Sequence, residues 1–159
     1  MRYRATAEGN IPFTAAEELE WDAKEAFEAA NALPNAKAAF IKQVDTDADA
    51  IIKAVRGERA TEYLLAEQES TAFKAAGYTG TVPGSVSSEA TAKGVTAHVA
   101  CDTILATAAG WRTAQAALRA QRLQSKAAAS TAADVTALDA IKAQWVGFLV
   151  ALKGQLGVA

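Results

Sequence analysis

One uninterrupted segment constrains this chain more than any other feature. Between residues 97 and 128 there is no proline and a single glycine, Gly110. Ile104, Trp111 and Leu118 recur every seven residues within it, which places them on one face of a helix. At 1.5 Å per residue such a helix is roughly 45 Å long, whereas a compact domain of this size has a radius of gyration of only about 15 Å. The segment therefore predicts an elongated helical bundle.

The C-terminal residues predict a second long helix, over about 132–155. Ser130 or Thr131 is expected to cap its start. Because the connection between the two long helices is short, we expect them to form an antiparallel hairpin, with Trp111 and Trp145 in the core. Apolar residues follow the spacing of one helical face throughout this segment: Val135, Leu138, Ile141, Trp145, Phe148, Leu149, Leu152 and Leu156.

The rest of the chain is also helical in pattern. We expect Pro34 to end the first helix, because the residue before a proline disfavours the α region, and Gly77 to end another. The prediction is therefore an all-α fold: an elongated helical bundle of about four to five helices, with a short extended N-terminal arm. Further helices are predicted over 14–33, 47–76 and 85–93, and 35–44 is predicted to be a second helical stretch, as a short continuation.

Alanine makes up about a quarter of the chain, and it is the best helix former but buries little apolar area. Helices lined with alanine approach each other closely, yet each contact adds modest burial energy. We therefore expect the apolar surface to be completed by another chain, either a second copy in a homo-oligomer or a partner protein.

The N-terminal residues are expected to form a separate docking unit. The chain divides into an N-terminal arm with its docking helix, 1–33, and a helical bundle, 34–159. Residues 1–13 alternate and contain a turn, which predicts a short extended arm that either frays or docks on another chain. Aromatic and apolar side chains of this unit are the expected partner contacts: Tyr3, Ile11, Phe13, Trp21 and Phe27.

A capping signal marks the start of the first helix. Thr14 and Glu17 match the T-x-x-E capping box, in which each side chain bonds a free backbone N–H of the other residue. Phe13 precedes the cap and is placed for a hydrophobic staple against Leu19. Trp21 stands among acidic residues, so it is either an interface anchor or part of an internal core.

Composition excludes several classes of function. A net charge of −2 is too balanced for sequence-independent binding to nucleic acid. The longest apolar run, residues 145–152, is far shorter than the roughly 20 residues that span a membrane. The acidic residues of 45–49 resemble a calcium loop, but Ala50 and Arg56 occupy the glycine and glutamate positions. We expect these acids to begin a helix, with no metal ion and no cofactor bound.

His98, Cys101 and Asp102 form the cluster that could carry chemistry. On a helix they share a face, which would permit a thiolate–imidazole pair or a partial metal site. However, the chain has one histidine, and a cysteine on an apolar helix face is usually a small core residue. We expect a structural role and no catalytic residue.

A basic run follows on the same predicted helix, with Arg112, Arg119, Arg122 and Lys126. These side chains could meet an acidic partner. We expect instead a solvated helix face, because glutamines are interspersed among them.

Two stretches resemble a known class of protein. The segment "IPFTAAEELEWDA" (11–23) is similar to the opening of tail-fibre assembly proteins and small tail proteins of bacteriophages. Residues 58–122, which include "ATEYLLAE", "AAGYTG" and "DTILATAAGWR", resemble a region of small tail proteins of phages and prophages of Gram-negative bacteria.

The resemblance implies a non-enzymatic tail component, made in the host cytoplasm and located in the virion tail. Its partner would be a tail fibre or baseplate protein. A tail-fibre assembly chaperone is the alternative that the resemblance leaves open, and a lytic or thiol-dependent accessory enzyme is the remote one. The chain lacks the C-terminal β domain of better-known fibre chaperones, which favours the structural role.

Overall fold

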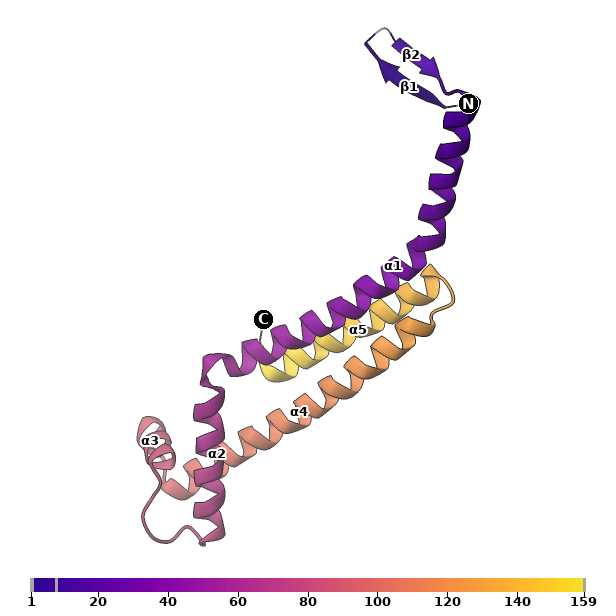
Figure 1. Ribbon diagram of the computed structural model, residues 1–159. Helices are drawn as coiled ribbons and strands as arrows, with labels where there is room; N and C mark the ends of the chain where they lie inside the picture. Colours follow the sequence, from indigo (N-terminus) through magenta and orange to yellow (C-terminus); the bar gives the residue numbers. More distant parts are fainter. Residues whose placement is uncertain (1, 8, 159) are drawn as a thin grey trace.

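Among the residues that the structure describes, the elements are five α-helices, one 3-10 turn and one small β-hairpin (Figure 1). The computed structural model describes residues 2–7 and 9–158, so the outer ends of the expected units 1–33 and 34–159 lie outside the described residues. The expected all-α, elongated bundle with a short N-terminal arm is confirmed. In chain order the elements are β1 (Tyr3–Thr6), β2 (Gly9–Pro12), α1 (Ala15–Arg56), a 3-10 turn (Gly57–Arg59), α2 (Ala60–Ala75), α3 (Gly84–Lys93), α4 (Ala97–Thr131) and α5 (Val135–Leu156).

A three-helix bundle of α1, α4 and α5 holds the larger core. Val44 from α1, Leu118 from α4 and Leu138 from α5 are almost completely buried in it. Trp145 lies at its centre and is 1% exposed, and its indole N–H donates to Asp47 Oδ2 at 2.9 Å. The antiparallel hairpin of α4 and α5 is confirmed, as is the burial of Trp145.

A second, smaller core forms where α2 and α3 pack against the start of α4. Phe73, Val86 and Cys101 are its main members. Both cores therefore share α4, whose 35 residues span roughly 52 Å. This long helix is why the molecule is a rod rather than a globule.

The helix expected over 47–76 is broken. Its first part belongs to α1, and the chain turns at Gly57 before α2 begins. Gly57 has φ 51° and ψ −142°, a backbone conformation that residues with a side chain rarely adopt. The position of this glycine inside an otherwise helical pattern was the available signal.

Pro34 does not end the first helix, and this expectation was wrong. Proline removes one backbone hydrogen bond and bends a helix, but it does not oblige the helix to stop. Pro34 is exposed, so its ring meets no packed neighbour, and α1 continues through it to Arg56. Figure 1 shows α1 bent where it leaves the bundle, and we attribute the bend to Pro34. The helical stretch expected over 35–44 as a short continuation is thus part of α1.

Two further expectations about helix ends need correction. The cap of α5 is Asp134, whose carboxylate accepts from the N–H of Ala137 at 2.8 Å, and Thr131 is the last residue of α4. The acidic residues of 45–49 lie inside α1 rather than at a helix start. Gly77, at φ 66°, follows the end of α2 as expected.

The core around Trp145 predicts a clear difference between two leucines. Leu138 is completely buried, so Leu138→Ala removes packed methyl groups and leaves a cavity, which costs about 2–5 kcal/mol of unfolding free energy. Leu123, on α4 of the same bundle, is 50% exposed, and Leu123→Ala should cost well under half of that. Chemical denaturation of both variants measures the difference, and equal losses would contradict this placement of the core.

Candidate docking site

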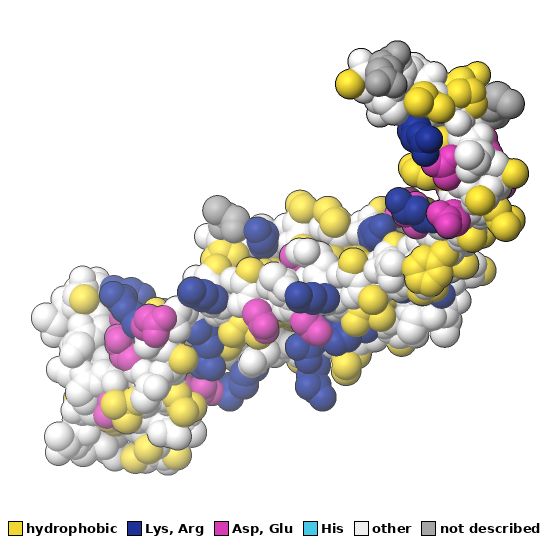
Figure 2. Space-filling model, turned by 45° about the horizontal axis from the view of Figure 1, so that its top comes forward, with side chains coloured by type: hydrophobic (Ala, Val, Ile, Leu, Met, Phe, Trp, Pro, Cys, Tyr) yellow, Lys and Arg dark blue, Asp and Glu magenta, His cyan; other side chains and the backbone are white. Residues whose placement is uncertain are grey.

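The N-terminal residues stand clear of the bundle. The hairpin and the first turns of α1, residues 2–7 and 9–33, extend past the turn between α4 and α5 (Figure 1); we call them the projecting segment. Every residue from Leu19 to Ala30 is exposed. Figure 2 shows hydrophobic side chains on this segment, at the upper right, alongside acidic and basic ones. A helix that no other helix of the described chain covers is an unusual place for apolar residues.

The hairpin packs on α1 through one of its two faces. Strands β1 and β2 are antiparallel, with Tyr3 opposite Pro12 and Arg4 opposite Ile11. Because side chains alternate between faces, Arg4 and Ile11 share one face and Tyr3 lies on the other. Arg4 pairs with Glu17 of α1, so the face with Ile11 is turned toward the helix and Tyr3 toward solvent.

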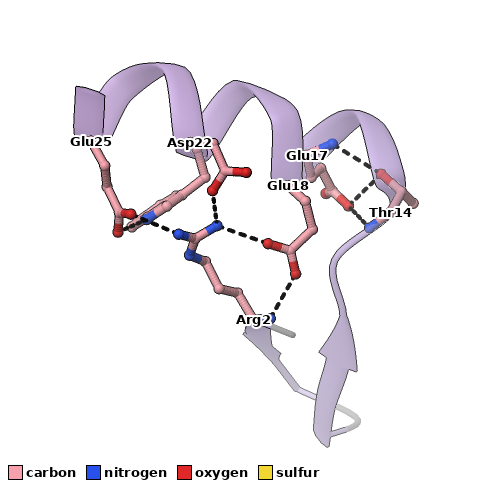
Figure 3. Close-up of polar contacts among 7 residues, drawn as sticks. Arg2, Thr14, Glu17, Glu18, Asp22 and Glu25 are labelled. Atoms are coloured by element: carbon pink, nitrogen blue, oxygen red, sulfur yellow. Dashed lines mark hydrogen bonds and ion pairs between the residues drawn. The ribbon is translucent and has the colours of Figure 1, made fainter. Parts of the chain in front are cut away.

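Arg2 fastens the hairpin to α1 by a fork of hydrogen bonds (Figure 3). Its backbone N–H donates to Glu18 Oε1 at 2.7 Å. Its guanidinium donates to Glu18 Oε2 at 2.8 Å, to Asp22 Oδ1 at 2.6 Å and to Glu25 Oε2 at 2.7 Å. Charge-assisted bonds from a planar fork fix both distance and direction, so the hairpin is held in one orientation.

Protonation equilibria reflect this fork. The pKa of Glu18 lies below its ordinary value, chiefly because the Arg2 backbone N–H donates to the carboxylate and then because of the guanidinium. The pKa of Arg2 is raised, first by its hydrogen bond to Asp22. At the cap, the pKa of Glu17 is lowered by the backbone N–H of Thr14 and then by its hydroxyl.

The expected capping box is present. Thr14 N–H donates to Glu17 Oε2 at 2.7 Å, and Glu17 N–H donates to Thr14 Oγ1 at 3.3 Å. The expected staple is wrong, because Phe13 packs edge-to-face on Trp21 at 5.7 Å between ring centroids, whereas Leu19 is 72% exposed. Leu19 lies on the opposite side of the helix from Trp21, so it points away from the hairpin.

Trp21 supports the hairpin and is not part of the bundle core. Its indole N–H donates to Glu25 Oε1 at 2.8 Å, and Lys24 Nζ lies 5.0 Å from its ring centroid. The tryptophan is still 40% exposed. Six residues separate it from Phe27, which places the two rings about 120° apart around the helix. The five expected contact residues therefore do not form one patch.

An apolar stripe on α1 connects the projecting segment to the bundle. Within the bundle, this helix buries residues at steps of three and four positions, from Leu33 through Phe40, Val44 and Ala48 to Ile51. The same steps continue backward from Leu33 through Ala30, Ala26 and Ala23 to Leu19, with Phe27 beside them. On the bundle side the stripe is covered by α4 and α5; on the projecting side the described chain leaves it uncovered.

The cover ends because the α4–α5 hairpin ends. Lys37 Nζ donates to the carbonyl oxygen of Ser130 at 3.3 Å, which places this part of α1 at the last turn of α4. Beyond that point the exposed stripe presents Leu19, which is 72% exposed, and Phe27, which is 70% exposed. Arg2 and the hairpin occupy a different side of α1, so they leave the stripe open.

The cluster of His98, Cys101 and Asp102 is divided by its surroundings. Cys101 is buried, and its thiol donates to the carbonyl oxygen of Ser70 at 3.2 Å. His98 Nε2 lies 3.3 Å from Asp102 Oδ2 at the surface. Lys74 lowers the pKa of Asp102 through a 2.7 Å contact. The thiol and the imidazole thus face different partners.

The basic run is largely paired within the chain. Lys126 Nζ lies 2.6 Å from Asp45 Oδ2, Arg122 lies 3.7 Å from Asp45, and Arg112 bonds Glu67. Arg122 and Lys126 are half-buried, so the expected solvated face is wrong for these two residues. Asp45 supplies the partner from α1, which sequence spacing alone could not indicate.

A groove of about 830 Å³ lies between α2, α3 and α4. Trp111 forms part of its lining and is 9% exposed, which agrees with the expected core position. Its indole N–H has no hydrogen-bond partner among the described residues, and the Arg56 guanidinium lies 5.8 Å from its ring. Glutamates surround the apolar floor, but Glu67 and Glu69 are already bonded, to Arg112 and to the N–H of Ser85.

Among residues 2–7 and 9–158, no group of three or more His, Cys, Asp or Glu side chains could hold a metal ion. By length and composition α5 could cross a membrane, with a mean hydropathy of 1.4 and 17% of the scored window buried. The apolar run of 145–152, on which the sequence-based expectation rested, is much shorter than this apolar helix, Val135–Leu156. The core helix of a soluble protein can have the same length and hydropathy but is mostly buried, whereas most of this window is exposed.

Comparison with known proteins adds no assignment: no protein family matches the chain, and no curated protein or solved structure matches it either.

Arg2 and its three carboxylate partners are the site residues that sequence reasoning missed. A signal existed, because Glu18, Asp22 and Glu25 recur at steps of four and three positions and so line one helix face. An isolated acidic ridge needs a cation, and Arg2 is near in sequence. The fold-back of the hairpin that brings Arg2 there was not predictable from spacing.

The fork makes attachment of the hairpin dependent on pH. Because the pKa of Glu18 is below the ordinary 4.5, its contribution is complete above pH 4.5 and is lost as pH falls through the lowered value. We expect an NMR titration of the Glu18 carboxyl carbon to show a midpoint below 4.5. Arg2→Ala should raise that midpoint, and Arg2→Lys should raise it less; an unchanged midpoint in Arg2→Ala would refute the fork.

Proposed function

We propose that the protein is a non-enzymatic phage tail component that binds a tail fibre or baseplate protein through its projecting segment. The uncovered stripe of α1 supports the binding role, and the resemblance of residues 11–23 and 58–122 to small tail proteins supports the tail assignment. It repeats the spacing that packs α1 against α4 and α5, so a helical partner of similar shape would extend the bundle. Amphipathic helices are recognised in this way through anchors at steps of three and four residues.

Preorganisation supports the same assignment. The hairpin, the Arg2 fork and the capping box hold the first turns of α1 in one conformation before any partner arrives. Binding then costs less ordering entropy than folding a disordered tail would. Four ion pairs from Arg2 and Arg4 to carboxylates of α1 therefore hold a capped helix whose apolar face is free to bind a partner.

Charge indicates the chemistry of the partner. Residues 1–33 carry three basic and seven acidic side chains, a net charge of −4, whereas the rest of the chain has a net charge of +2. The acids flank the stripe of Leu19, Ala23 and Phe27. The fitting partner therefore has an apolar helical face bordered by lysine or arginine, which would also accelerate association.

Two alanine substitutions of equal chemistry test the stripe. Ala23→Asp places a charge on it, and Ala32→Asp places the same charge on another exposed side of α1. We expect Ala23→Asp to reduce the copies per particle about tenfold or more, because a buried unpaired charge weakens an interface. Ala32→Asp should incorporate normally. Quantitative mass spectrometry of purified virions measures both, with thermal melts showing equal stability.

Other outcomes separate the competing roles. Loss of incorporation in both variants, or in neither, would rule out the stripe as the docking face. If the wild-type protein is absent from virions but co-purifies with fibres from infected cells, it is an assembly chaperone instead. If it is found with neither, the tail assignment fails.

A further inference from the structure

The outward face of α5 is a second apolar surface, far in sequence from the projecting segment. Only Leu138, Trp145 and Leu152 of this helix are buried, and they lie on one side. On the exposed side Val146 is 56% and Val150 is 66% accessible. No charged residue occurs from 143 to 152. A solvated helix face normally carries charges, and a helix that is apolar all round is normally buried all round.

A glycine lies at the centre of this face. Gly147 is inside α5, where glycine lowers helix stability relative to alanine. Apart from its chain neighbours and the nearby backbone of α5, no atom of the described residues would lie within 4 Å of a Cβ atom at this position, so packing within the chain does not require a glycine. Ala143 and Ala151 lie one turn before and one turn after it, and both are exposed. These three small residues form a strip with little side-chain bulk, which we call the Gly147 strip, and which allows the backbone of another helix to approach closely.

We propose that α5 pairs antiparallel with α5 of a second copy, about a two-fold axis at Gly147. A two-fold contact uses the same patch on both copies. This patch is self-complementary, because Val146 and Val150 of one copy can pack into the space over the small residues of the other. The shallow apolar groove between α1 and α5, about 330 Å³ with Phe40 and Val146 in its lining, widens the surface beside it.

Charges at the two ends of α5 select the antiparallel direction. Asp139 lies eight residues before Gly147 and Lys153 six residues after it. They are about four turns apart, so they lie on the same edge of the helix. Asp139 Oδ1 lies 2.9 Å from Lys142 Nζ of its own helix. In the antiparallel pair, Lys153 of the other copy joins this ion pair, and this occurs twice. A parallel pair would align Lys153 with Lys153.

The same residues argue against a membrane as the occupant of this face. The stretch of α5 without charge is ten residues long, about half of what a spanning helix needs. Asp139 and Lys142 at one end and Lys153 at the other border it on the outer edge. Vesicle binding is therefore the rival outcome that the experiment must distinguish.

A pair of glycine substitutions tests the contact. Gly147→Leu adds a bulky side chain to the Gly147 strip. Gly110→Leu makes the same change at an exposed mid-helix glycine of α4 that also has open space around it. By sedimentation analysis we expect wild type and Gly110→Leu to dimerise and Gly147→Leu to show a dimer dissociation constant about tenfold higher or more. The melting temperature of the Gly147→Leu monomer should not fall, because leucine favours the helix.

Charge reversal tests the direction. Lys153→Asp should weaken the dimer, and adding Asp139→Lys should restore it. A wild type that is monomeric at every concentration, a dimer unaffected by Gly147→Leu, or equal weakening by Gly110→Leu would overturn the proposal. So would a double variant no better than Lys153→Asp, or a monomer that floats with phosphatidylcholine–phosphatidylglycerol vesicles.

Discussion

The packing of α1, α4 and α5 around Trp145 is the interaction on which the rest of the structure depends. Trp145 is 1% exposed, and its one polar atom is satisfied by Asp47 of α1, so burial of the ring leaves no unpaired group. The contact joins the last helix to the first over 98 positions of sequence. It sets how α1 lies on the α4–α5 hairpin, and through α1 it determines where the N-terminal residues project.

Alanine explains both the length of the rod and its open faces. Ala48, Ala114 and Ala129 are core residues, and they let the helices lie close together while burying little area each. Few bulky side chains remain to cover the outer surfaces. Two of those surfaces stay apolar: the stripe around Leu19 on α1 and the Gly147 strip on α5. We proposed the first as the docking face for a helical partner and the second as the contact with another copy of the chain.

Two kinds of force hold the two ends of α1. In the bundle, apolar burial is the main force that fixes the helix. In the projecting segment, Arg2 and its carboxylates fix the hairpin, and these exposed ion pairs weaken in salt and in acid. The projecting segment is thus ordered enough to present a face and weakly enough attached to adjust on binding.

The sequence by itself determined the helices, their stripes and several of their ends, because periodicity, the Thr14–Glu17 capping box and glycines such as Gly77 act over a few neighbouring residues. It did not determine what Pro34 and Gly57 would do. Proline and glycine each permit a bend or a stop, and the packing of α1 in the bundle decided that the helix continues at Pro34 and turns at Gly57.

The sequence also did not pair Arg2 with Glu18, Lys126 with Asp45, or Phe13 with Trp21, since these contacts arise where distant or folded-back segments meet. Tertiary structure alone showed that α4 and α5 end beside Lys37, which leaves the stripe of α1 uncovered, because cover requires a second surface that the spacing of one helix cannot reveal.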